Sequence, residues 1–198
     1  MDPNVIISRL QRLAKLDTTV FDEVRDDPQE LVPSLIVLAV SSILAGLGAM
    51  LFWEVVPDFS GYEDNVLNTL ILGSIFLAAM YLVGVLIIYV VLAQMFKVTA
   101  DVQSLIRVCS YAALPMAASV LMFIPAIYPV FALVPIVLTF VLLIYAVQSA
   151  TGAESEQIVM ATGVGFAVMV LVLGFIAQST SGASVPIGAG VFGILLNF

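Results

Sequence analysis

Residues that could carry out chemistry are scarce in this chain of 198 residues. It has fourteen acidic and six basic side chains, no histidine and one cysteine, Cys109. Without histidine, the commonest general acid–base group and the commonest metal ligand are absent. One cysteine can form neither an internal disulfide nor a thiolate cluster. We therefore expect no catalytic residue, no metal site and no cofactor, and we predict that the protein is not an enzyme.

The composition places the chain in a membrane. Apolar residues make up 62% of it and charged residues only 10%, and the mean hydropathy is +1.18. A typical soluble domain is about half apolar and about a quarter charged. The net charge of −8 argues against a nucleic-acid partner, which would require a basic surface. Membrane lipids are therefore the expected partners.

Charge-free tracts predict the elements that must position any functional side chain. A helix that crosses a membrane needs about 20 apolar residues. On this criterion the chain is an all-α integral membrane protein, a five-transmembrane-helix bundle preceded by short cytoplasmic interfacial helices in residues 1–30. The five helices of the 31–178 domain are expected at about 31–53, 68–96, 104–124, 129–149 and 157–178. Residues 179–198 should form an extracytoplasmic apolar tail, and a short sixth crossing within 185–198 is the alternative.

The basic residues predict the orientation. Four of them precede the first crossing and two flank the link between the second and third, whereas residues 54–64 contain only acidic charges. If the N-terminus is cytoplasmic, all six basic residues lie inside, as the positive-inside rule requires. We expect a multi-pass protein of the plasma membrane with an extracytoplasmic C-terminus.

The segment before the first crossing is amphipathic. Apolar residues in 3–16 recur at helical spacing, and basic residues edge the stripe. Such a helix can lie in the headgroup layer of an anionic leaflet, or it can pack on the cytoplasmic ends of the other helices. The candidate contacts with the membrane surface or a partner are Arg9, Arg12, Lys15, Phe21, Arg25, Lys97 and Arg107.

Inside the membrane, the informative residues are small residues and prolines. No Asp, Glu, Lys or Arg lies in the middle of a predicted crossing, which argues against a proton- or ion-coupled transporter. Pro115 and Pro135 should kink the third and fourth crossings. Arg107 should lie at the interface, paired with a lipid phosphate or an acidic residue, and a grip on a ligand is the alternative. Packing within the bundle, or self-association, is expected at Ser41, Ala45, Ala49, Gly163 and Ala167.

Three short segments carry a family resemblance. They are Val20–Pro28 followed by Leu31-Val32-Pro33, Arg107 to Tyr111-Ala-Ala-Leu-Pro115, and Gln148–Gly152. They resemble three segments of the Yip family, the Ypt/Rab-interacting membrane proteins. The first is similar to the segment before the membrane, the second to the Arg…Tyr-Ala-x-x-Pro stretch, and the third to the short turn between the last two crossings. The resemblance implies a helical membrane domain without known catalytic activity, in which Pro28, Pro33, Arg107, Tyr111 and Pro115 are motif residues.

The family's eukaryotic members are linked to Rab GTPases and vesicle traffic. The chain departs from these members because it lacks a long cytosolic N-terminal region, and this argues against GTPase binding. It looks more like the compact bacterial or archaeal members.

Two functions follow from these features. The first is a non-enzymatic membrane scaffold or adaptor that contacts lipid, another membrane protein or a second copy of itself. The alternative is a translocator or binder of a lipid or small apolar solute, which would use a cavity between the kinked third and fourth crossings.

Overall fold

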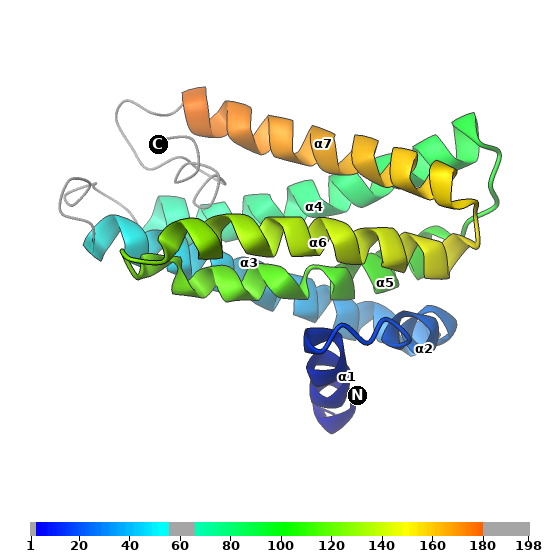
Figure 1. Cartoon of the computed structure of the whole chain (residues 1–198), viewed down its shortest axis with the longest axis horizontal. Coiled ribbons are helices and arrows are strands. Elements are labelled where there is room, and N and C mark those ends of the chain that lie inside the picture. The colour runs from blue at the N-terminus through cyan, green and yellow to red at the C-terminus, as the bar shows by residue number, and fades with distance from the viewer. Residues whose placement is uncertain (1–2, 56–65, 180–198) are drawn as a thin grey trace.

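The structure is a computed structural model that describes residues 3–55 and 66–179, and every regular element in those ranges is helical (Figure 1). Five helical stretches are long and apolar enough to cross a membrane, which confirms the predicted fold class. They are Pro28–Val55, Thr69–Met95, Val102–Phe123, Tyr128–Thr151 and Ser155–Ile176. The predicted outer loop and the tail after residue 179 lie outside the described residues, apart from residues 54 and 55.

The helices follow one another with short links. The elements are α1 (Pro3–Ala14), α2 (Val20–Asp26), the 3-10 turn η1 (Pro28–Glu30), α3 (Leu31–Val55), the π-helical η3 (Val66–Leu72), α4 (Gly73–Val90), the π-helical η4 (Val91–Met95), α5 (Val102–Ala112), the 3-10 helix η5 (Leu114–Phe123), α6 (Tyr128–Thr151) and α7 (Ser155–Ser179). Helices α3 to α7 run side by side, and α1 stands at a steep angle to them (Figure 1).

Local side-chain chemistry explains where the crossings begin and end. The Asp27 carboxylate accepts a hydrogen bond from the Gln29 amide at 2.9 Å, and Pro28 occupies the first helical position. Asp101 caps α5 in the same way through the Ser104 amide at 2.7 Å. Helix α6 ends at Gly152, whose φ of 59° is the left-handed conformation that glycine adopts without steric cost.

The third crossing changes its helical type halfway. It is α-helical to Ala112 and becomes a 3-10 helix at Leu114, directly before Pro115. Proline has no amide hydrogen and disfavours the α conformation of the residue before it, so the α-helical ladder is interrupted here. A 3-10 helix rises about 2 Å per residue, so the ten residues of η5 cover roughly 20 Å.

Small residues let the crossings approach closely. Ser41, Ala45 and Ala49 are all buried on α3. A Cβ on Gly165 of α7 would lie 2.5 Å from the Gly84 carbonyl oxygen of α4. The buried Tyr81 hydroxyl donates to the Cys109 carbonyl at 2.6 Å and joins α4 to α5. Of the small residues predicted to pack helices, the three on α3 are therefore buried within the bundle. Gly163 has open space beside it and Ala167 is exposed.

Candidate functional site

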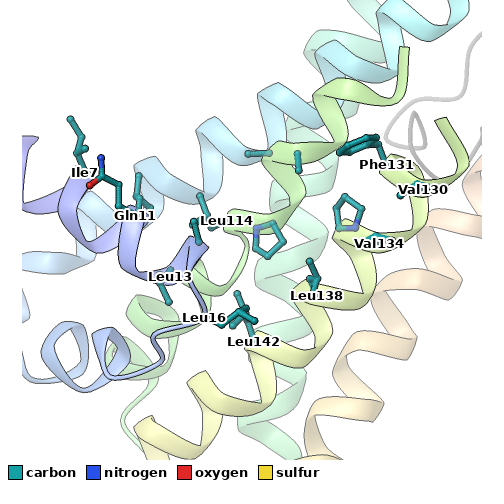
Figure 2. Close-up of a pocket in the computed structure, with 16 residues that line it drawn as sticks. Ile7, Gln11, Leu13, Leu16, Leu114, Val130, Phe131, Val134, Leu138 and Leu142 are labelled. Carbon is teal, nitrogen blue, oxygen red and sulfur yellow. The ribbon is translucent and has the colours of Figure 1, made fainter. Parts of the chain in front are cut away.

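An apolar groove lies between α1, η5 and α6, and its volume is about 580 Å³ (Figure 2). Helix α1 supplies one wall, and the third and fourth crossings supply the other. Gln11 is the one polar side chain among the described residues that line it. The lining residues are Ile7, Leu10, Gln11, Leu13, Ala14, Leu16, Leu114, Pro115, Ala117, Ala118, Val130, Phe131, Val134, Pro135, Leu138 and Leu142.

Two prolines and two alanines leave room for the groove. Pro115 and Pro135 both line it, one from each crossing. Pro135 lies inside α6 and cannot donate to the carbonyl four residues earlier, at Phe131, which also lines the groove. Ala117 and Ala118 carry only a methyl group each. The kinks predicted from the two prolines therefore mark the crossings between which the cavity lies.

The groove follows α6 for much of that helix. Its lining extends from Val130 to Leu142, and twelve residue steps of 1.5 Å give about 18 Å. Figure 2 shows Leu13 and Leu16 toward the end of the groove at Leu142, with Val130 and Phe131 at the opposite end. Helix α1 therefore covers one end of an elongated apolar surface.

The end of α1 adopts an unusual backbone conformation. Leu16 has a φ of 62°, and the amide of Asp17 donates to the Arg12 carbonyl at 3.0 Å, which is the pattern of a Schellman cap. Glycine usually occupies this position, because the left-handed conformation costs other residues about 1–2 kcal/mol. A leucine here instead adds an apolar side chain to the groove, 61% of it exposed. Nothing in the hydrophobic pattern of the sequence identifies this role of Leu16.

A buried polar cluster ties α1 to two crossings. Arg9 Nη1 of α1 lies 2.5 Å from Glu30 Oε1, and each of the two side chains is only 11% exposed. The other carboxylate oxygen, Oε2, accepts a hydrogen bond from the Tyr111 hydroxyl of α5 at 2.9 Å. Burial lowers the pKa of Arg9, but the hydrogen bond and the charge of Glu30 outweigh it, so the pKa is raised overall. In the sequence, Asp27-Pro28-Gln29-Glu30 has the order of a helix start, and this pattern does not indicate that Glu30 meets Arg9 or Tyr111.

Arg12 holds the turn that follows α1. Its guanidinium contacts Asp17 at 2.8 Å, Glu23 at 2.6 Å and the Thr19 hydroxyl at 2.9 Å. Hydrogen bonds from the Thr19 hydroxyl and from Arg12 lower the pKa of Asp17 to about 2. Arg12, a candidate contact with the membrane surface or a partner, is therefore occupied by charged groups of this chain.

Two further arginines connect α2 to the bundle. Arg25 donates to the Ser149 carbonyl at 2.8 Å and pairs with Asp26, which raises the pKa of Arg25. Arg107 is buried and donates to the Arg25 carbonyl at 2.7 Å. The Asp101 carboxylate, an acidic group of the kind expected beside Arg107, lies 4.0 Å from its guanidinium.

The other predicted contact residues have different surroundings. Phe21 is fully buried, because the apolar face of α2 packs on α5 and α6. Lys15 and Lys97 are exposed and form no ion pair among the described residues. Pro28 begins η1, and Pro33 is buried in the first turn of α3, where a proline is tolerated. Residues 3–55 and 66–179 contain no group of three His, Cys, Asp or Glu side chains that could hold a metal ion.

Comparison with known families supports the resemblance found in the sequence. A family model described as the Yip1 domain matches residues 17–177. No curated protein and no solved structure matches the chain significantly. The match starts just after α1 and includes α2, Glu30, Tyr111 and all five crossings. The chain therefore belongs to the Yip1 domain family and is a multi-pass membrane protein.

Proposed function

We propose that this Yip family member is a non-enzymatic membrane protein that binds one lipid acyl chain in the groove between α1, η5 and α6. The observation that carries the proposal is the apolar volume of about 580 Å³ beside the third and fourth crossings. Pockets for small ligands commonly measure about 300–1,000 Å³. Since Gln11 is the one polar lining residue, a hydrocarbon guest leaves almost no polar group unpaired.

The length of the groove supports an acyl chain as the guest. The hydrocarbon core of a bilayer is about 30 Å thick, so each leaflet contributes roughly 15 Å. The groove follows α6 for about 18 Å, close to the depth of one leaflet. A chain lying there would make dispersion contacts along its whole length, each of them small but additive.

A scaffold or adaptor role is the second candidate. It has less support, because most of the residues that suggested a partner surface make contacts within the chain. The basic side chains that suggested a contact surface are largely engaged within the chain, at Arg9, Arg12, Arg25 and Arg107. The small residues of α3 are buried inside the bundle. A partner protein would therefore have to use surfaces other than these.

We also propose that the end of the bundle that contains α2 and the α6–α7 turn faces the cytoplasm at the plasma membrane. Arg25 of α2 donates to the Ser149 carbonyl close to the α6–α7 turn, and Arg107 donates to the Arg25 carbonyl. The link between η4 and α5, which contains Lys97, lies at the same end (Figure 1), so the positive-inside rule supports this orientation.

Two matched substitutions on α6 test the lipid proposal. Val134 lines the groove and Val137, three residues later, is exposed on α6 outside it. Native mass spectra of protein released gently from its own membrane should show one retained lipid in the wild type and in Val137→Trp. Val134→Trp fills the groove and should reduce that occupancy at least about tenfold, equivalent to ~1.4 kcal/mol.

Equal lipid occupancy in the two variants would refute the groove as the binding site. A stoichiometric companion protein without any retained lipid would favour the adaptor role instead.

A further inference from the structure

We infer that α1 is a gate over the groove, and that the buried contact among Arg9, Glu30 and Tyr111 is the latch that keeps it closed. The inference rests on the proposed lipid binding, because a gate acts only where a guest enters and leaves. It adds a mechanism by which one carboxylate controls that exchange.

Helix α1 is a wall of the groove that is poorly packed by apolar contacts. Leu13 is its one fully buried residue, at 1% exposure. Ile7 faces the groove but is 52% exposed, and Leu16 at the end of the helix is 61% exposed. Little apolar surface therefore holds α1 against η5 and α6, and its position must depend on other contacts.

The latch supplies those contacts through one side chain. Glu30 lies where the chain begins its first crossing, and its two carboxylate oxygens bind different elements. Oε1 pairs with Arg9 of α1 at 2.5 Å, and Oε2 accepts from Tyr111 of the third crossing at 2.9 Å. Charge-assisted hydrogen bonds are about twice as strong as neutral ones, and burial removes the competing water. Neutralising Glu30 should therefore weaken the attachment of α1 more than any surface change does.

The contacts around Arg12 locate the pivot. Helix α2 cannot move easily, because Val20, Phe21 and Val24 are fully buried. The turn between α1 and α2 contains Leu16 with its φ of 62°. The side chains in its ion pairs from Arg12 to Asp17 and Glu23 are 36–44% exposed. Exposed pairs of this kind contribute little to stability. Once the latch is open, α1 can swing about this turn while α2 stays in place.

Distances between spin labels test the movement. Nitroxides attached to Ser8→Cys on α1 and Val141→Cys on α6, in a Cys109→Ala background, are measured in phosphatidylcholine nanodiscs. Both label positions are exposed and neither lines the groove. The wild-type latch should give one narrow distance distribution, and Glu30→Gln should give a broad one. Asp26→Asn, which removes a charge that is 68% exposed and pairs with Arg25 rather than with α1, should keep the narrow distribution.

Lipid exchange tests whether the movement is a gate. Replacement of the bound lipid by deuterated phosphatidylcholine is followed by native mass spectrometry. Exchange should be about tenfold faster in Glu30→Gln than in the wild type, the factor expected when one charge-assisted bond is lost. If Glu30→Gln does not fold, Arg9→Gln opens the same contact from α1 and leaves Glu30 bonded to Tyr111.

The outcomes separate the two proposals. An unchanged distance distribution in Glu30→Gln would overturn the latch. A broader distribution without faster lipid exchange would overturn the gate, while lipid retained by the wild type would still support the proposed function. A wild type that holds no lipid in the groove would refute the proposed function and the gate with it, even if α1 moved.

Discussion

A close approach between the first and third crossings makes a sharp test of the packing. Gly48 of α3 lies against the backbone of η5. A Cβ at this position would be 2.7 Å from the Val120 Cα and closer still to the Ser119 carbonyl oxygen, whereas ordinary van der Waals contact begins at 3.4 Å. Both neighbours are backbone atoms and cannot rotate away. In Gly48→Ala the two crossings must therefore move apart, and they lose contacts along their shared face.

The expected magnitude combines two opposing effects. Overpacking typically costs about 1–3 kcal/mol. Alanine recovers up to about 1 kcal/mol of helix propensity relative to glycine. Because the clash is with backbone atoms, the overpacking cost should lie in the upper part of its range, at about 2–3 kcal/mol. After the offset, Gly48→Ala should lower the free energy of unfolding by about 1–2 kcal/mol.

Gly163 supplies the matched control on another helix. No atom lies within 4 Å of the place where its Cβ would be, so Gly163→Ala adds helix propensity without a clash. It should raise the free energy of unfolding by about 0.5–1 kcal/mol. Unfolding is followed by circular dichroism during titration with sodium dodecyl sulfate in mixed micelles. Shifts of the same sign in both variants would refute the described approach of α3 to η5.

Two further predictions concern individual polar contacts. Tyr81→Phe removes the bond from the buried hydroxyl to the Cys109 carbonyl and should lower the free energy of unfolding by about 0.5–1.5 kcal/mol in the same titration; no measurable change would mean that this bond is not formed. The carboxyl of Asp17, whose pKa is lowered to about 2 from an ordinary value of 3.8, accepts a bond from the Thr19 amide at 3.1 Å. Because the folded pKa is below the unfolded one, the contribution of Asp17 is fully present above about pH 4 and is lost as the pH falls through about 2. The amide chemical shift of Thr19 should titrate with that midpoint in the wild type and not in Asp17→Asn, and a midpoint near 3.8 would contradict the Arg12–Asp17–Thr19 contact.

The crossings could be predicted because a membrane imposes a demand on each segment separately. Every crossing must be apolar over about 20 residues and must satisfy its own backbone hydrogen bonds, so local composition is sufficient. Proline chemistry also led to Pro115 and Pro135 as the predicted kinks of the third and fourth crossings, and both residues line the groove. The change to a 3-10 helix at Leu114 was not predicted, because a proline signals an interruption but not the conformation that replaces the α-helix.

The basic residues show what cannot be predicted from the helix face on which a residue lies. Arg9 belongs to the basic edge of an amphipathic helix, and such an edge normally faces the headgroup layer. In the structure Arg9 instead pairs with Glu30. A buried carboxylate without a partner costs more free energy than the loss of a contact between an exposed arginine and a lipid phosphate. The pairing joins residues 21 positions apart and gains a third member, Tyr111, another 81 positions along the chain. No spacing in the sequence indicates that the three meet.

The sequence by itself determined that this chain is a helical membrane protein with five crossings, charges at their ends and a Yip-type order of motifs. These properties depend on the composition of each segment and on the solvent around it. Only the tertiary structure decided where α1 docks, which glycines lie against backbone atoms and that an apolar groove remains beside the third and fourth crossings. These properties depend on how helices pack in three dimensions, because side chains that are distant in the sequence must fill the same space.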